Sequence, residues 1–549
     1  MKTRILCAQK LRVKPIAAGL ALVLAASVAG FPVDSLAAGV TPASKSWHGW
    51  LAAHPDVKAR VDNARQHSRA KRQQRAQLLR SGYTASSNAV AAVLPVSNCN
   101  DNGAGSLRDV IAGAATGDTI DLTALTCSTI TLTSGTVSIP QDDLTITGPG
   151  AANLTLHGND TDTVLFATGA GTLTVSDVTI SHGYYYAAIG AGVWSANGNV
   201  VLNNTVLSDN ATGGGRYYPA GGAAVATGYG DITLSNSTVS NNSSQGYVAY
   251  GAVAAMAGNV TVVGSTISGN QSNPAGTGYF GVGGGIYSNG TTTTVDSTIA
   301  QNSATGTYGS WGGGINAIGS ASISGSAVSG NSVGSNGGGV YTQNLMLINS
   351  TVSGNQSNAY GAGVGNYGGT AAIYNATLSA NTAGVDGGGI DSSGGSAFTV
   401  VSSILFGNTA PTDADVFLYF AGGSGSMTGS NNVIGSTSAV TPAGTLTTDP
   451  LLGPLQNNGG PTATHAPGAG SPAIDAGANP LALGTDQRGT GFPRVAAAAA
   501  DIGAVEVQPA VVLAPAIPVP ASANWALALL GALMGFAGWL GFRRRPTAG

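Results

Sequence analysis

Carboxylate and aromatic side chains are the groups in the middle of this sequence that could do chemistry. Seven aspartates occur in the central region: Asp209, Asp231, Asp296, Asp386, Asp391, Asp413 and Asp415. A polysaccharide lyase needs carboxylates gathered around Ca²⁺ and an Arg or Lys base, and a glycoside hydrolase needs carboxyl groups on neighbouring elements. Here the aspartates are spread over many repeats, and Arg216 is the single Arg or Lys between Arg108 and Arg488. The residues favour binding over catalysis and predict no catalytic residue, metal site or cofactor. Cleavage of an acidic polysaccharide by a lyase or hydrolase stays the alternative.

Aromatic residues gather in the segments whose length varies between repeats. Aromatic rings suit the apolar faces of sugars and also partner proteins. The residues that we expect to bind a glycan chain or a cell-surface partner are Tyr217, Tyr218, Tyr279 and Trp311. The alternative is that these rings pack over their own loops.

A five-residue phrase, Thr, a branched apolar residue, Ser, any residue and Asn, recurs along the chain and must position these side chains. Its final residues are Asn210, Asn242, Asn270, Asn302, Asn331, Asn355, Asn381 and Asn408. The 198 residues from Asn210 to Asn408 divide into seven steps, so the mean period is about 28 residues, a length typical of solenoids.

A second phrase, Gly and Ala followed by Val or Ile, alternates with the first. Its apolar residues are Val193, Val225, Val253, Ile286, Ile315, Val340, Val364 and Ile390. From each of these residues to the next Asn the distance is nearly constant, 15 to 18 residues, but from each Asn to the next Val or Ile it varies from 9 to 16 residues. One rigid part and one variable turn per repeat, with short β-branched strands, predict an all-β parallel β-helix.

The recurring Asn has a physical reason in such a stack. Equivalent side chains of neighbouring coils lie about 4.8 Å apart, so each carboxamide can donate to the carbonyl oxygen of the next one. We therefore expect the eight Asn residues to form a ladder. The alternative reading, that Asn is only a turn former, does not explain one Asn at the same turn of every repeat.

Composition and charge distribution bound the function. The chain has 549 residues, 8% charged residues and a net charge of −3, and no Lys occurs after Lys71. The repeats cannot neutralise a row of phosphates, which excludes nucleic-acid binding by the solenoid.

Residues 1–37 are typical of a secretory signal peptide, with an uncleaved membrane anchor as the alternative. Residues 38–97 are expected to form a basic arm that is either helical or flexible. The alternative is that this arm binds anionic lipid or an envelope polymer.

The first coils and their cap are expected in residues 98–183, before the repeats of 184–448. Ser106 and Asp109 have capping-box spacing, and Leu107 and Ile111 give a short helix one apolar face that could close the open end of the stack. Cys99 and Cys127 remain after removal of the leader. In an oxidising compartment we expect them to form a disulfide, with two buried thiols as the alternative.

Several motifs resemble known families. The segments Gly105–Asp109, Gly117–Ile120 and Leu144–Gly150 resemble the opening of secreted bacterial right-handed parallel β-helix proteins. Within residues 449–507, the motifs Pro454–Thr462, Gly470–Gly477, Asp486–Gly489 and Asp501–Glu506 resemble the choice-of-anchor Q domain. That resemblance implies an exported surface protein and no enzymatic activity. Its polar residues are expected to form a hydrogen-bonded cap over the last coils.

The tail has a Pro-rich linker, residues 508–524, followed by an apolar segment and an Arg cluster in residues 525–549. The 18 apolar residues from Trp525 to Phe542 are just long enough to span a bilayer as a C-terminal hydrophobic helix. The arrangement resembles the IPTL-CTERM and PEP-CTERM sorting signals, with Val519 and Pro520 in place of Thr-Leu. It implies recognition by an envelope sorting protease and a location in the cell envelope, on the outer surface or outside the cell. The alternative is a permanent anchor.

Overall fold

The computed structural model describes residues 91–186, 189–214, 218–274, 278–393, 397–420, 423–424, 427–508 and 523–542. The chain divides into two units, Met1–Val507 and Gln508–Gly549. The predicted signal peptide, most of the basic arm, most of the linker and the Arg cluster lie outside the described residues.

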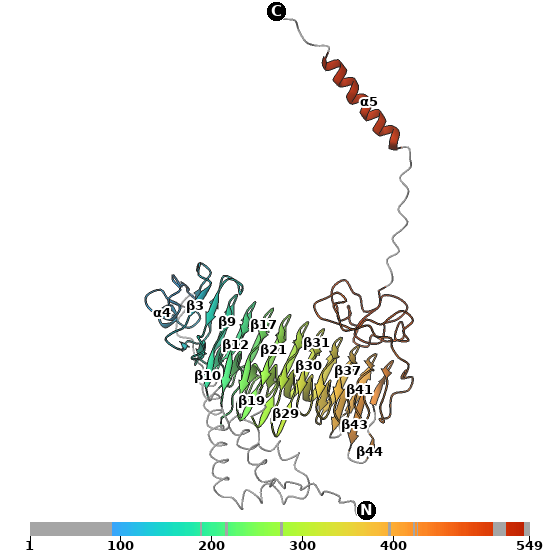
Figure 1. The fold of residues 1–549 in the computed structure, drawn as a ribbon, viewed down its shortest axis with the longest axis horizontal. Helices are drawn as coiled ribbons and strands as arrows, with labels where there is room; N and C mark the ends of the chain where they lie inside the picture. Colours follow the sequence, from blue (N-terminus) through green and yellow to red (C-terminus); the bar gives the residue numbers. More distant parts are fainter. Residues whose placement is uncertain are drawn as a thin grey trace, which may run out of the picture. The chain divides into compact units, whose positions relative to one another are not determined.

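The first unit is an all-β parallel β-helix whose coils stack along one axis (Figure 1). One strand of each coil belongs to a 12-stranded sheet, here called the flank sheet, so the stack has about 12 coils. The strands of the flank sheet are β3 (Thr129–Thr131), β6 (Thr155–His157), β9 (Thr179–Ser181), β13 (Val206–Ser208), β17 (Thr238–Ser240), β22 (Thr266–Ser268), β27 (Thr298–Ala300), β31 (Ala327–Ser329), β34 (Thr351–Ser353), β38 (Thr377–Ser379), β42 (Ile404–Leu405) and β46 (Val433–Ile434).

A 23-stranded sheet, the long sheet, holds two columns of strands that merge in two long strands, β30 (Ile315–Ser324) and β33 (Val340–Ile348). The first column also contains β4 (Val137–Ile139), β7 (Leu165–Ala167), β11 (Val193–Ser195), β15 (Val225–Thr227), β20 (Val253–Ala255), β25 (Ile286–Ser288), β36 (Val364–Asn366), β40 (Ile390–Ser393), β43 (Val416–Phe420) and β44 (Gly423–Ser424). The second column contains β1 (Val93–Pro95), β2 (Thr119–Asp121), β5 (Leu144–Thr147), β8 (Thr172–Ser176), β12 (Asn199–Asn203), β16 (Ile232–Ser235), β21 (Val260–Val263), β26 (Thr291–Val295), β37 (Thr370–Tyr374), β41 (Ala397–Val401) and β45 (Met427–Ser430).

Two smaller sheets complete the coils. The narrow sheet has eight strands: β10 (Tyr184–Tyr186), β14 (Ala211–Gly213), β18 (Ser243–Gln245), β23 (Gln271–Ser272), β28 (Ser303–Ala304), β32 (Ser332–Val333), β35 (Gln356–Ser357) and β39 (Thr382–Ala383). The outer sheet has three strands, built from the inserted segments: β19 (Val248–Tyr250), β24 (Phe280–Val282) and β29 (Gly309–Trp311). Among the described strands, every pairing is parallel except that of β43 with β44.

The interior of the stack is made by the apolar residues of the two sequence phrases. The Val and Ile residues of the second phrase pair in one register, from Val193 through Ile286 to Ile390, and all are fully buried. Glycine is required just before them, because Gly312 and Gly337 have φ angles of +65° and +72° and a Cβ would meet a backbone carbonyl. This requirement explains the Gly-rich phrase.

The recurring Asn residues lie inside the stack as one hydrogen-bonded column. From Asn210 to Asn408, each Nδ2 donates to the Oδ1 of the next member at 2.8–3.0 Å. Asp415 accepts from Asn408 Nδ2 at 2.8 Å and so ends the column, and Gly183 N donates to Asn210 Oδ1 at its other end. Each carboxamide of the column therefore has hydrogen-bond partners within the protein.

A second column, of serine, lies at the other end of each flank strand. The backbone N–H groups of Ser237, Ser265, Ser297 and Ser326 each donate to the hydroxyl of the serine in the next coil, at 2.9–3.2 Å, and the column reaches Ser350. Sequence analysis missed this column, although a Ser precedes most copies of the first phrase. Each flank strand of these coils therefore lies between two side-chain ladders.

The N-terminal end of the stack is closed by a short helix, α4 (Leu107–Gly113), as expected. Ser106 is its N-cap and accepts from Asp109 N, while Leu107 and Ile111 are buried against the first coils. A disulfide joins Cys99 to Cys127 beside it.

Residues 449–507 lie on the flank sheet of the last coils, not across the open end of the stack (Figure 1). Thr351 Oγ1 donates to Gln487 Oε1 at 2.6 Å, and Ala504 N donates to Thr377 Oγ1 at 3.0 Å. Ile404 packs with Ile502 in a small apolar cluster. The segment follows the flank because outward-facing hydroxyls there satisfy its polar groups, and residues 440 and 446 cover the end instead.

Among its described residues, the second unit contains the helix α5 (Ala523–Phe542). Within the described residues, no helix is both long enough and apolar enough to cross a membrane.

Candidate functional site

The outer sheet covers the long sheet of the coils that carry long inserts. Tyr250 and Tyr287 are buried between the two layers, with ring centroids 4.6 Å apart, and Phe280 packs in the same cluster. Burial raises the pKa of both tyrosines, so their phenols stay neutral. The inserts therefore form a second apolar core and present a fixed outer surface.

Four tyrosines form a column along this surface, one from each of four successive coils. The backbone N–H of Tyr247 donates to Tyr218 O at 2.9 Å, that of Tyr279 to Tyr247 O at 3.2 Å, and that of Tyr308 to Tyr279 O at 2.9 Å. We call these four residues the tyrosine ridge. Tyr218 and Tyr308 are 53% and 55% exposed, and the two central members are half-buried.

Three of the four rings of the tyrosine ridge lie against one another. The centroids of Tyr247 and Tyr279 lie 4.7 Å apart, and those of Tyr279 and Tyr308 lie 4.8 Å apart, with interplanar angles of 38° and 22°. Ring edges and hydroxyl groups are thus the parts that the two central rings can offer to solvent. Burial, followed by the neighbouring phenols, raises the pKa of Tyr247, so its hydroxyl stays a hydrogen-bond donor.

The structure separates the four predicted ligand-binding residues. Tyr218 and Tyr279 belong to the tyrosine ridge, and Tyr217 lies outside the described residues. Trp311 ends the outer-sheet strand β29 and packs beside Phe280, with centroids 5.9 Å apart, so it is not a member of the ridge.

Sequence reasoning did not select Tyr247 and Tyr308 as ligand-binding residues. Counting back six or seven residues from Val225, Val253, Ile286 and Ile315 finds all four members of the ridge. That nearly constant offset was the available signal.

Two of the seven aspartates interact. Asp386 precedes the Gly-rich turn before β40, Asp391 lies in β40, and Asp391 is 7% exposed. Burial, and then the charge of Asp386, raise the pKa of Asp391 to about 7. The stacked rings of Tyr341 and Tyr367, 4.7 Å apart, lie on the same face of the late coils. A carboxyl group of this kind can hold or release a proton near neutral pH.

The described residues offer neither a grouped set of metal ligands nor an arginine without a carboxylate partner. Within the described part of the chain, no three His, Cys, Asp or Glu residues are grouped to hold a metal ion. The arginines in residues 91–508 that are described, Arg108, Arg488 and Arg494, all have carboxylate partners.

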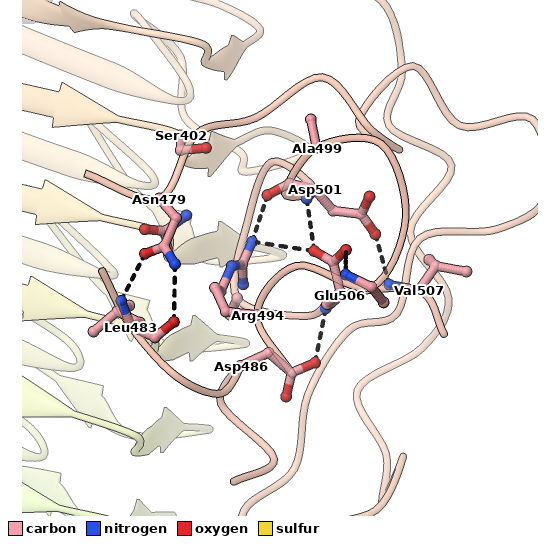
Figure 2. Close-up of polar contacts among 12 residues, drawn as sticks. Ser402, Asn479, Leu483, Asp486, Arg494, Ala499, Asp501, Glu506 and Val507 are labelled. Carbon is pink, nitrogen blue, oxygen red and sulfur yellow. Dashed lines mark hydrogen bonds and ion pairs between the residues drawn. The ribbon is translucent and has the colours of Figure 1, made fainter. Parts of the chain in front are cut away.

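The polar motifs of residues 449–507 meet in a buried cluster (Figure 2). Asp501 Oδ1 and Oδ2 accept from the backbone of Asp475 and Val507, and Glu506 Oε2 accepts from Asp501 N, at 2.6–2.7 Å. Arg494 Nη2 donates to the carbonyl oxygen of Asp501. These carboxylates satisfy turn backbone, which is a structural task and not a catalytic one.

Arg488 neutralises the remaining carboxylate of the cluster. Its Nη2 lies 2.6 Å from Asp486 Oδ2, its guanidinium carbon lies 3.9 Å from the centroid of Phe492, and Asp486 Oδ2 also accepts from Glu506 N at 2.8 Å. The pair anchors the end of the segment at Glu506.

No protein-family model matches this chain, and no curated protein matches it either. Among solved structures, it is similar to the crystal structure of pectate lyase Pel9A, with 16% identity and a TM-score of 0.37 over 76% of this chain and 97% of that chain. A likeness at this level carries no argument about what the chain binds or does.

Proposed function

We propose that this parallel β-helix is an exported cell-surface protein that binds an extended, uncharged glycan chain along the tyrosine ridge. The observation that supports the proposal is the register of Tyr218, Tyr247, Tyr279 and Tyr308, one per coil. A row of hydroxyls at the coil spacing suits a repeating ligand with hydroxyl groups. The scarcity of Lys and Arg in the repeats disfavours an acidic glycan.

The test removes the hydroxyls and keeps the rings. The triple variant Tyr247→Phe, Tyr279→Phe, Tyr308→Phe should retain the stack and the melting temperature and lose about tenfold or more in affinity for a neutral glycan on an array. Tyr419, which is 57% exposed on β43, supplies the matched control Tyr419→Phe. Unchanged binding by the triple variant would rule out the ridge as the binding surface.

Export and anchoring complete the proposal. The resemblance of residues 449–507 to the choice-of-anchor Q domain, and of the tail to a sorting signal, supports attachment to the cell envelope. Deleting residues 517–549 should release the protein into the medium, as measured by fractionation of cells and culture. Full retention at the surface would shift anchoring to the basic arm, residues 38–97.

A second candidate function is polysaccharide cleavage, favoured by one observation, the raised pKa of Asp391 beside Asp386. Release of reducing ends or unsaturated products from a polysaccharide panel, abolished by Asp391→Asn, would support this candidate. Wild-type protein that releases neither product excludes it for that panel.

A further inference from the structure

A polar cleft of about 620 Å³ lies between the solenoid and residues 449–507. The solenoid side contributes Asp296, Gly325 and Asn349, and the other side contributes Thr485, Arg488 and Thr490. The volume is within the range of small-molecule sites and far above the space of one water molecule.

The wall from the C-terminal side is held in place by its own hydrogen bonds. Asn479 Nδ2 donates to Leu483 O and Leu483 N donates to Asn479 Oδ1, both at 2.8 Å, which fixes the loop that enters the cleft (Figure 2). Asn349 Nδ2 donates to Thr485 O at 3.1 Å and ties the loop to the solenoid. The cleft is therefore formed before any ligand arrives.

The solenoid side presents acceptors without matching donors. Asn349 is 8% exposed, and its Oδ1 has no hydrogen-bond partner among the described residues. An unpaired buried acceptor costs free energy, so a ligand donor there would be favoured. Asp296 stands at the rim, and its Oδ1 lies over the glycine of the next coil, Gly325, where a side chain would collide with it. The missing side chain leaves the space between Asp296 and Asn349 open.

The charge of the cleft is negative. Arg488 is already paired with Asp486, and no cation is paired with Asp296 in the residues that the structure describes. Asp296 is exposed at the rim, although partial desolvation raises its pKa. Its carboxylate is therefore accessible to a cation, and a cation that carries additional donor groups can also serve the unpaired Asn349 Oδ1.

We propose that this cleft binds an amino-sugar unit, with the protonated amine on the Asp296 carboxylate and a ligand hydroxyl or amine donating to Asn349 Oδ1. A bare divalent ion fits less well, because Ca²⁺ takes about six to eight oxygen ligands and no group of three ligating side chains exists among the described residues. The cleft lies beside the flank sheet and the tyrosine ridge lies along the outer sheet, so each site can fail separately.

The experiment titrates the full chain with glucosamine, N-acetylglucosamine and CaCl₂, read by ligand-observed NMR and calorimetry. We expect glucosamine to bind, and Asp296→Asn to weaken it about tenfold. Asn tolerates the left-handed backbone of Asp296, whose φ is 48°, so the variant should fold. N-acetylglucosamine, which lacks the charge, should bind as weakly to wild type as glucosamine does to the variant.

The control is Asp209→Asn, an exposed aspartate with φ of 57° at a different turn of the coil, which should bind like wild type. Asn349→Gly keeps the left-handed backbone and removes Oδ1, and it should also weaken glucosamine binding. No binding of glucosamine by wild type, equal binding by Asp296→Asn, or a response to CaCl₂ alone would each overturn the proposal.

Discussion

The early coils (residues 184–330) and the late coils (residues 331–434) share one cross-section but thicken on different faces. In the early coils the long sheet is covered by the outer sheet, and among the described residues the C-terminal segment reaches only the last of these coils, where Thr462 Oγ1 donates to Gly325 O and Gln487 Nε2 donates to Ser326 O. From β31 onward the inserts are short, and residues 449–507 cover the flank sheet. One of these layers carries the tyrosine ridge, and the other borders the polar cleft. The internal ladders make this possible, because a rigid coil accepts an added layer on either side without rearranging its core.

The largest effect is expected from Asp391, which lies on the face of the late coils that no outer sheet covers. Asp391 pairs with Gly365 in a column that holds Ala226 and Ala254 in the early coils. Its pKa is raised from 3.8 to about 7 in the folded protein, so the unfolded chain ionises first as pH rises. Stability should therefore fall between about pH 4 and pH 7 and stay low above that range.

Asp391→Asn, which cannot ionise, should raise the free energy of unfolding at pH 8 by about 2 to 4 kcal/mol and change it little at pH 4. Urea unfolding at three pH values measures this difference. The same pH dependence in the variant and the wild type would mean that the Asp391 carboxylate is already solvated in the folded protein.

The second prediction tests what the two regions share. Asn270→Ala in the early coils and Asn355→Ala in the late coils each remove the two bonds to neighbouring carboxamides of the Asn column, together with the side chain's bonds to backbone groups, and leave a neighbour unpaired. Each should lower the free energy of unfolding by about 1 to 3 kcal/mol, and by similar amounts. Thermal unfolding of both variants decides the matter, and a loss confined to one region would show that the ladder supports only that region.

The smallest effect separates the two flanks. Thr351→Val should cost about 1 kcal/mol, because Gln487 loses its donor in a buried seam. Thr238→Val, at the same register in the early coils, should stay within about 0.5 kcal/mol. Equal costs would indicate that something also covers the early flank in solution.

The repeat, the Asn column, the capping helix and the disulfide could all be expected from the sequence. They depend on residue types that recur at one spacing or stand alone as a pair, as Cys99 and Cys127 do. The serine column was equally regular, with Ser237, Ser265 and Ser297 before successive copies of the phrase, and needed only a search one residue upstream.

The added layers could not be derived in the same way. Residues 449–507 meet Thr351 and Thr377 across more than a hundred positions of sequence, and no periodicity marks that contact. The stacking of Tyr247 on Tyr279 depends on the register of inserts of different length, which strand pairing fixes only in the folded chain.

The buried cluster that ends at Glu506 has a mechanical consequence. Glu506 N and Val507 N donate to the buried carboxylates of Asp486 and Asp501, so a pull on the chain beyond Val507 loads these two side chains first. Those side chains pass the load to the flank sheet through the seam at Thr351 and Thr377. Tension then acts in shear on several coils at once and does not peel the terminal coil. In a molecule that is held by its C-terminal tail, a drag force would therefore be distributed over many coils of the β-helix.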